Sequence, residues 1–183
     1  MENRIFITNT FTVENAVNEN EFLNISGYCC KYGGVNLNGE AVDANSFNTF
    51  FKMRESGQIR PYFNWEHTDT TIGGIDEIKS DENGLFIKCH LTKGVAIVRD
   101  MIAPLVISGD LNSFSTEGRI LNGYDGIVQL PEGGYYVKDF ILLGVSVVRT
   151  PACPDAKFTL SNYIREYEER KREQEKKIKW YLY

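Results

Sequence analysis

The chain of 183 residues is long enough for one domain of ordinary size and too short for a large multidomain architecture. Its hydrophobic fraction of 42% and its charged fraction of 25% are those of a globular protein and not of a disordered one. The net charge of −5 argues against nucleic acid as the main partner, because no chain-wide positive field attracts a phosphate backbone. Apolar runs such as Phe140 to Val148 are too short to cross a membrane, and no signal-like segment opens the sequence, so we expect a soluble protein of the cytosol.

The first half of the chain has the pattern of short strands with one helix. Residues 22–32 are rich in aromatic and β-favouring side chains and predict a first long strand. Residues 45–57 predict a short helix, and a strand-like run then ends at His67. In residues 85–91 the aliphatic side chains alternate with the others, which places His90 on the opposite face. We therefore expect His90 at the surface or rim.

The second half contains one more predicted helix and the most apolar stretch of the protein. Residues 94–107 have helix-like apolar spacing, although Pro104 should end or kink this helix near Ala103. A candidate strand follows at 111–120, and residues 135–154 predict one long strand or two. Short strands in quick succession with two or three helices favour a mainly β, α+β fold. We predict an antiparallel barrel-like sheet with peripheral helices.

The chemistry-bearing residue types are scarce. Four cysteines, at positions 29, 30, 89 and 153, suit neither a disulfide framework nor a zinc site, so buried reduced thiols are expected. His67 and His90 are the only histidines, which excludes a multi-histidine metal centre. We expect no metal and no cofactor, and any imidazole chemistry must use one of these two side chains.

The C-terminal stretch differs from the rest of the sequence. Within residues 165–179, glutamates precede an arginine or a lysine by four positions, a spacing that stabilises a solvated helix. We predict one domain over residues 1–160 and a charged C-terminal helix over 161–183. A docking or coiled-coil arm is the functional alternative for that helix, supported by a weak apolar stripe that includes Ile164 and Tyr167.

Several longer motifs follow one another in a fixed order over about residues 22–157. They are ISGYCCKYGG, NSFNTFF, NWEHTDTTIGGIDEIKSDENGLFIKCHL, SGDLNSFSTEGRI and LLGVSVVRTPACPDA. In this order the chain resembles the tailed-bacteriophage prohead proteases, the serine endopeptidases of capsid maturation, which share their fold with the herpesvirus maturational protease. Several motifs in the right order are more specific than any one of them.

The resemblance implies a serine and a histidine as the reacting pair. Carried over by position, His67 is the general base and Ser115 the nucleophile, with Ser113 as a rival two residues earlier. His67 would take the Ser115 proton as the hydroxyl attacks a peptide carbonyl, giving an acyl-enzyme that water then hydrolyses.

The third catalytic position departs from the family pattern. An acidic residue normally precedes the V-S pair there, and this chain has Gly144, which cannot orient an imidazole. Glu117 is the substitute that we adopt, because two residues along a strand return a side chain to the face that carries Ser115. Asp69, Asp139 and a water molecule in a two-residue dyad stay open as alternatives.

The resemblance also implies partners and a place of action. We expect a protease that cleaves the phage scaffold or an extension of the major capsid protein, and itself, inside the procapsid in the host cytoplasm. Neither nucleic acid nor membrane is expected as a partner, and both a monomer and a homo-oligomer stay open. The alternative function, which Gly144 keeps open, is an inactive homologue that serves as a non-enzymatic assembly factor.

Overall fold

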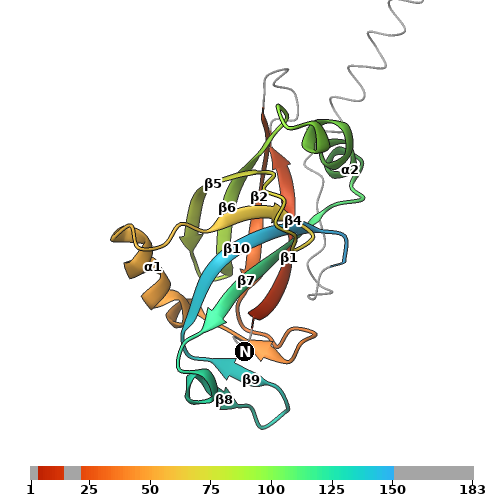
Figure 1. The fold of residues 1–183 in the computed structure, drawn as a ribbon. Coiled ribbons are helices and arrows are strands. Elements are labelled where there is room, and N and C mark those ends of the chain that lie inside the picture. The colour runs from red at the N-terminus through yellow and green to blue at the C-terminus, as the bar shows by residue number, and fades with distance from the viewer. Residues whose placement is uncertain (1–3, 15–21, 151–183) are drawn as a thin grey trace, which may run out of the picture.

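The computed structural model describes residues 4–14 and 22–150 of the chain. These residues form two sheets with short helices at their periphery (Figure 1). The predicted charged helix at 161–183, the domain boundary at 160 and Cys153 lie outside the described residues.

The larger sheet has seven strands in the order β4-β10-β7-β1-β2-β6-β5. Their bounds are β1 Arg4–Glu14, β2 Phe22–Lys31, β4 Tyr62–Trp65, β5 Gly73–Ser80, β6 Gly84–Thr92, β7 Ser113–Ile120 and β10 Phe140–Val148. The smaller sheet has the order β3-β9-β8, with β3 Glu40–Ala41, β8 Ile127–Gln129 and β9 Tyr135–Val137. The α-helices are α1 Asn48–Glu55 and α2 Ala103–Ser108, and the short helical turns are Ala44–Phe47, Val98–Ile102 and Gly123–Gly126.

The large sheet is open and does not close into a barrel. Its edges are β4, which runs parallel to β10, and β5, which runs antiparallel to β6. The edges approach each other at one end, where the Ile72 N–H donates to the Phe63 carbonyl and the Ile72 carbonyl accepts from the Thr92 N–H. With four residues, β4 is too short to pair along the eight residues of β5. The mainly β, α+β class is therefore confirmed, whereas the barrel-like closure is wrong.

A strand that sequence analysis did not predict stands in the middle of the large sheet. β1 pairs antiparallel with β7 on one side and with β2 on the other. Its sequence, RIFITNTFTVE, is rich in β-branched residues, which is a strand signal. The strand predicted as the first, at 22–32, is consequently the second, β2.

The predicted helices form with local differences. The first, predicted over residues 45–57, opens with the helical turn Ala44–Phe47 and continues as α1 to Glu55. The Asp43 carboxylate caps its start by accepting the backbone N–H groups of Asn45 and Ser46. The second changes from a π-helical turn to α2 at Ala103, where the irregularity was predicted. Pro104 stands in the first turn of α2, where a backbone N–H needs no intrahelical partner.

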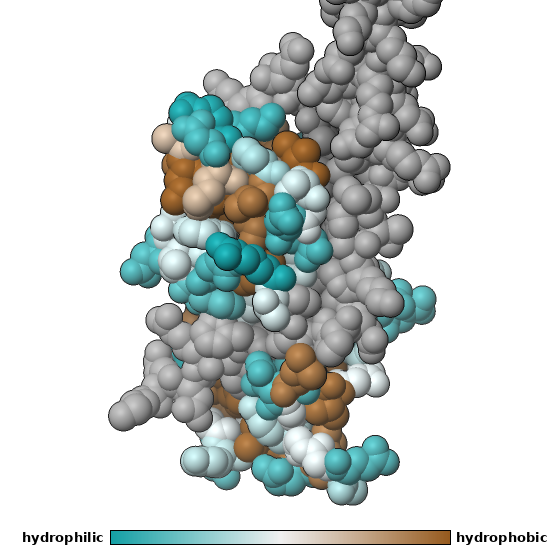
Figure 2. Space-filling view, turned by 90° about the vertical axis from the view of Figure 1, so that its right-hand side faces the viewer, coloured by the Kyte–Doolittle hydropathy of each residue, from teal (hydrophilic) through white to brown (hydrophobic). Residues whose placement is uncertain are grey.

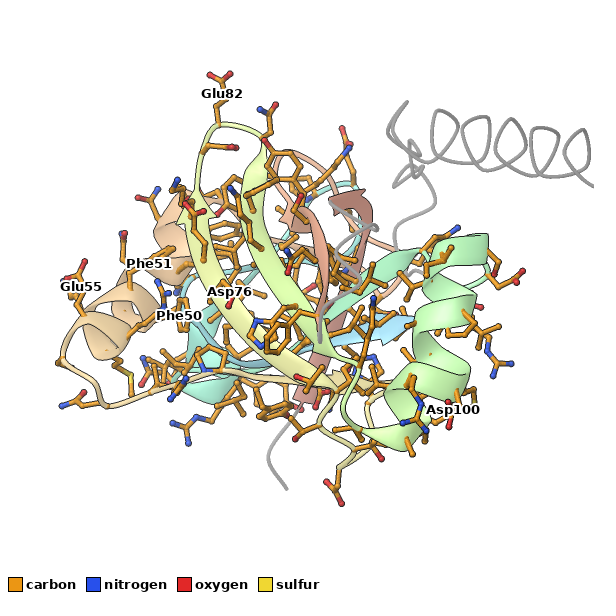
Figure 3. All side chains as sticks on the ribbon, turned by 90° about the horizontal axis from the view of Figure 1, so that it is seen from above. Phe50, Phe51, Glu55, Asp76, Glu82 and Asp100 are labelled. Atoms are coloured by element: carbon orange, nitrogen blue, oxygen red, sulfur yellow. The ribbon has the colours of Figure 1, made fainter. Side chains whose placement is uncertain are left out.

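The hydrophobic core is built on one face of the large sheet and is covered by α1 and the helical turns. Aromatic rings pair within it: Phe63 with Phe114 at 6.3 Å between centroids, and Phe47 with Phe140 at 5.7 Å. Phe50 of α1 points toward this core and is buried, as the view from above shows (Figure 3). Three cysteines, at positions 29, 30 and 89, are buried and free, so the expectation of buried reduced thiols is confirmed for them.

The surface of the described residues is mixed in polarity. In the view of Figure 2, apolar residues show at the upper end of the molecule and at the lower end, where the small sheet lies. Exposed apolar side chains of this region include Leu37, at 68%, and Tyr124, at 88%. No helix of this part of the chain combines the length and the apolar character that crossing a membrane requires.

Truncation of a core ring is expected to destabilise the fold strongly. Phe47 is fully buried against Phe140, so Phe47→Ala should lower the free energy of unfolding by about 3–5 kcal/mol. Tyr124→Ala removes an aromatic ring at the surface and is expected to change it by less than about 0.5 kcal/mol. Urea unfolding followed by circular dichroism measures both, and equal losses in the two variants would contradict this assignment of the core.

Candidate functional site

Side chains from three neighbouring strands, β4, β10 and β7, meet on the face of the sheet opposite the Phe63–Phe114 pair. Paired residues of adjacent strands point to the same face, and successive residues of one strand alternate between faces. Two transverse rows of paired residues therefore present their side chains together. The serine row contains Asn64, Ser146 and Ser115, and the glutamate row contains Tyr62, Gly144 and Glu117.

His67 reaches this face through a tight turn that follows β4. Glu66 and His67 both have positive φ angles, 49° and 57°, a backbone conformation that few non-glycine residues adopt. Two hydrogen bonds to β10 hold the turn: the Glu66 N–H donates to the Val147 carbonyl at 3.0 Å, and the His67 N–H donates to Ser146 Oγ at 3.2 Å. The strand thus ends two residues before His67, and the turn brings the imidazole beside the two rows.

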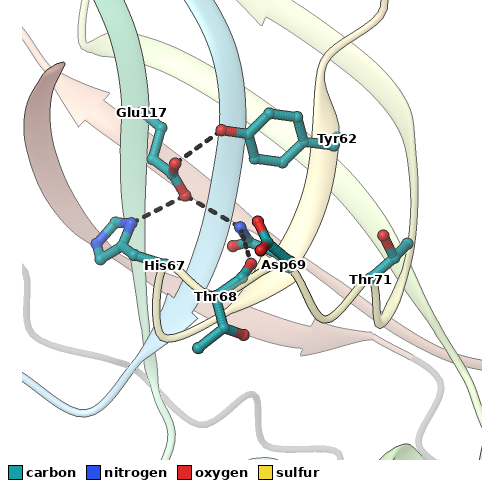
Figure 4. A pocket seen from close by; sticks show the side chains of 7 residues that line it. Tyr62, His67, Thr68, Asp69, Thr71 and Glu117 are labelled. Carbon is teal, nitrogen blue, oxygen red and sulfur yellow. Dashed lines mark hydrogen bonds and ion pairs between the residues drawn. The ribbon is translucent and has the colours of Figure 1, made fainter.

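The Glu117 carboxylate is the centre of the site (Figure 4). Its Oε1 atom lies 3.0 Å from His67 Nδ1 and accepts hydrogen bonds from Asn64 Nδ2 at 3.1 Å and Ser146 Oγ at 2.9 Å. Its Oε2 atom accepts a hydrogen bond of 2.7 Å from the Tyr62 hydroxyl. The side chain is 3% exposed, so these four neighbours take the place of water around the charge.

The charge of this carboxylate fixes the role of the histidine ring. Burial raises the pKa of Glu117, but the hydrogen bonds from His67, Tyr62, Asn64 and Ser146 outweigh burial and lower that pKa to about 2. Glu117 is therefore ionised at neutral pH and requires a donor at Nδ1 of the imidazole. The neutral ring then carries its proton on Nδ1 and keeps Nε2 as the basic nitrogen.

Two members of the site were not predicted from sequence. Ser146 is fully buried, accepts the His67 N–H and donates to Glu117, so it ties the turn to the carboxylate. Asn64 contacts Ser146 closely through Oδ1 and uses Nδ2 to bond both Glu117 and, at 2.7 Å, the carbonyl of Thr68. Ser146 belongs to the V-S pair of the recognised motif, whereas the sequence around Asn64 carries no signal beyond a polar residue in an apolar strand.

The predicted nucleophile and its rival stand at different distances from the glutamate row. Ser115 is two residues before Glu117 on β7, fully buried, and its Oγ has no hydrogen-bond partner among the described residues. Ser113 lies two residues before Ser115 on β7, farther from Glu117, and pairs with Val148. Its hydroxyl donates to Asn112 Oδ1 at 2.8 Å. Of the two hydroxyls, that of Ser115 is therefore nearer to the carboxylate row and uncommitted within the described chain.

The alternative carboxylates lie apart from the imidazole nitrogen. Asp69 lines the same cleft but makes no hydrogen bond or ion pair with His67 in the described part of the chain. Asp139 precedes β10 and accepts a 2.6 Å hydrogen bond from the hydroxyl of Thr49 in α1. His90, as predicted, is at the rim, where its Nδ1 pairs with Asp76 at 2.7 Å.

A cleft of about 300 Å³ opens beside the imidazole. Its walls are Tyr62, Asn64, His67, Thr68, Asp69, Thr71 and Glu117. Hydroxyl, amide, imidazole and carboxylate side chains line it, which suits a polar substrate. Within residues 4–14 and 22–150, no group of three histidine, cysteine or acidic side chains is arranged to bind a metal ion.

Comparisons with known proteins identify the family of the chain. The chain matches the caudovirus prohead serine proteases over residues 10–173 and belongs to that family. Among solved structures it is similar to the capsid assembly protease gp21 of bacteriophage T4, with a TM-score of 0.64 and 15% identity over 79% of this chain and 96% of that one. Comparison with curated proteins gave no match. The resemblance to the prohead proteases is thus confirmed, and the relation to the herpesvirus enzyme stays a prediction.

Acid should remove the stability that the Glu117 charge provides. The pKa of Glu117 is about 2 in the folded chain and about 4.3 in an unfolded one, so the ionised carboxylate stabilises the fold above pH 4.3 and ceases to do so as the pH falls toward 2. Glu117→Gln should therefore cost about 1–3 kcal/mol of unfolding free energy at pH 7 and about half as much at pH 3, where part of the stabilisation by the charge is already lost.

Urea unfolding of both proteins at pH 7, 5 and 3 measures this difference. Glu82→Gln is the matched control, because Glu82 projects from the turn between β5 and β6 (Figure 3) and should show no such trend. A cost for Glu117→Gln that is the same at all three pH values would contradict the stabilising role of the charge.

Proposed function

We propose that this protein is a serine endopeptidase of capsid maturation. Ser115 is the nucleophile, His67 the general base and Glu117 the carboxylate that orients the imidazole. The observation that carries the proposal is the 3.0 Å contact between His67 Nδ1 and Glu117 Oε1. Glu117 lies on the same strand, β7, and on the same face of the sheet as Ser115. A carboxylate on one ring nitrogen leaves the other as a base for a serine hydroxyl.

The proposed reaction proceeds in two stages, acylation and deacylation. His67 Nε2 accepts the Ser115 proton while Oγ bonds to the carbonyl carbon of the scissile peptide, and the carbonyl electron pair moves to its oxygen. When this intermediate collapses, the C–N bond breaks and the imidazolium returns the proton to the leaving amine. Water, deprotonated by the same nitrogen, then releases the acyl group. Glu117 stays ionised throughout and stabilises the imidazolium.

Family membership and the fold similarity support a role in capsid maturation. The substrates we propose are the phage scaffold protein, an extension of the major capsid protein and the enzyme's own chain, cut inside the procapsid in the host cytoplasm. The support is the family, whose members are prohead serine proteases, and a structural neighbour described as a capsid assembly protease.

Removal of the nucleophile tests the enzyme against the non-enzymatic assembly factor. Ser115→Ala should abolish processing of co-expressed capsid and scaffold proteins, because the hydroxyl forms the acyl bond. Ser113→Ala, two residues away and equally buried, is the matched control and should keep activity. Intact-mass measurement of the products detects cleavage. Activity that survives Ser115→Ala and is lost in Ser113→Ala would move the nucleophile, and a parent chain that never cuts would favour the assembly factor.

The base and its carboxylate have matched controls elsewhere in the chain. His67→Ala and Glu117→Gln should each lower kcat by about a hundred- to ten-thousand-fold, since an unactivated serine is a poor nucleophile at neutral pH. His90→Ala is the matched control and should change it little, because His90 pairs with Asp76 outside the site. Asp69→Asn tests the rival carboxylate, which lines the cleft but has no hydrogen bond to the imidazole among the described residues. Loss of activity in Asp69→Asn and not in Glu117→Gln would contradict these roles.

A further inference from the structure

The ring of Tyr62 lies directly over Gly144. In the glutamate row, Gly144 of β10 lies between Tyr62 of β4 and Glu117 of β7. A Cβ atom built on Gly144 would lie 2.1, 2.4 and 2.5 Å from Cε2, Cδ2 and Cζ of the Tyr62 ring, distances at which atoms overlap. The ring of Tyr62 thus occupies the space that any side chain at position 144 would need.

This arrangement lets Tyr62 reach across a whole strand. Neighbouring strands are about 4.8 Å apart, so β4 and β7 are separated by roughly 10 Å with β10 between them. The Tyr62 ring lies over Gly144, and its hydroxyl donates to Glu117 Oε2 at 2.7 Å. A long, rigid side chain with a polar tip makes this contact only if the residue beneath it has no side chain.

The tyrosine contact differs in kind from the others at the carboxylate. His67, Asn64 and Ser146 all contact Oε1, whereas Tyr62 is the one donor to Oε2 in the part of the chain that the structure describes. A carboxylate held at one oxygen can rotate about its Cγ–Cδ bond. The hydrogen bond at the second oxygen removes that freedom and keeps Oε1 directed at the imidazole.

We infer that Tyr62 is a positioning residue of the site and that Gly144 is required because it seats the Tyr62 ring. The inference rests on the proposed function, in which the orientation of His67 sets the rate. In this arrangement the carboxylate stands on β7, and Gly144 on β10 leaves room for the tyrosine ring that fixes it. Tyr62 is also part of the cleft wall, so contact with substrate is the competing role to be tested.

Tyr62→Phe is the primary variant, because it keeps the ring on Gly144 and removes only the hydroxyl. We expect kcat to fall about tenfold with KM unchanged, since the lost hydrogen bond to a charged group loosens the base and not the substrate. The ¹⁵N and ¹H NMR signals of the His67 Nδ1–H group should also broaden or shift, because that proton loses a fixed acceptor. A higher KM with unchanged kcat would make Tyr62 a substrate contact, and unchanged kcat and NMR signals would overturn the inference.

Gly144→Ala tests the seat of the ring. The added methyl group must displace Tyr62, so this variant should lose about as much kcat as Tyr62→Phe and show the same change in the His67 signal. Gly94→Ala is the matched control, because a Cβ at Gly94 meets no atom within 4 Å, and it should behave as the parent. The double variant of Tyr62→Phe and Gly144→Ala should lose much less than the product of the single losses, since both act through one hydrogen bond. Multiplicative losses would overturn the link between Gly144 and Tyr62.

Two further measurements keep the outcomes distinct. If Gly144→Ala does not fold, Gly144→Ala in a Tyr62→Ala background removes the collision and should recover the unfolding free energy, which a clash with any other group would not allow. If the parent chain shows no proteolysis that depends on Ser115, the proposed function fails while the NMR measurement still decides whether Tyr62 positions Glu117 against His67. An Nδ1–H signal that is identical in the parent and in Tyr62→Phe would then overturn the positioning role on its own.

Discussion

The structure of the site depends on one buried negative charge. Glu117 is nearly inaccessible to water and yet ionised at neutral pH, which is possible only because four polar groups from β4, β10 and the turn after β4 surround it. Charge-assisted hydrogen bonds of this kind are stronger than neutral ones, and each is costly to leave unmade. The carboxylate therefore holds together three segments that are distant in the sequence, and it fixes the imidazole in the geometry on which the proposed mechanism depends.

The open edge of the large sheet is linked to the position of His67, because both depend on where β4 ends. β4 is a short parallel strand on β10, and after Trp65 its chain leaves the sheet to form the turn that carries His67. A longer β4 that continued toward β5 would close the barrel, but it would also carry residue 67 along the sheet instead of folding it back over β10. The N–H groups of Glu66 and His67 both bond to β10, to the Val147 carbonyl and to Ser146 Oγ, so the turn lies against β10. Closure of the sheet and placement of the base are thus alternative uses of the same segment.

Sequence analysis predicted most of the elements that depend on the local pattern of residues, and it missed the contacts that depend on the register of neighbouring strands. Period-two burial in β6 and the helix after Asp43 follow from neighbouring residues, and Glu117 was found because a period of two relates it to Ser115. β1 was overlooked although its composition carried a strand signal. The contact of Tyr62 with Glu117 joins residues 55 positions apart, and it becomes visible only when β4, β10 and β7 are aligned. No local pattern contains that alignment, so Tyr62, Asn64 and Ser146 could not be assigned from the chain alone.

The register also explains how a carboxylate reaches the imidazole although position 144 is a glycine. Side chains of directly paired residues on adjacent strands share a face, with Cβ atoms about 5 Å apart. Gly144 and Glu117 are such a pair, so a carboxylate on either strand projects into the same small volume beside the imidazole. A carboxylate on β7 faces the imidazole from a different side than one on β10 would. Glu117 contacts His67 through Oε1, and its second oxygen, Oε2, is held by the Tyr62 hydroxyl. Tyr62 can supply that donor only over a residue without a side chain, so glycine at position 144 and glutamate at position 117 are one structural solution and not two independent departures.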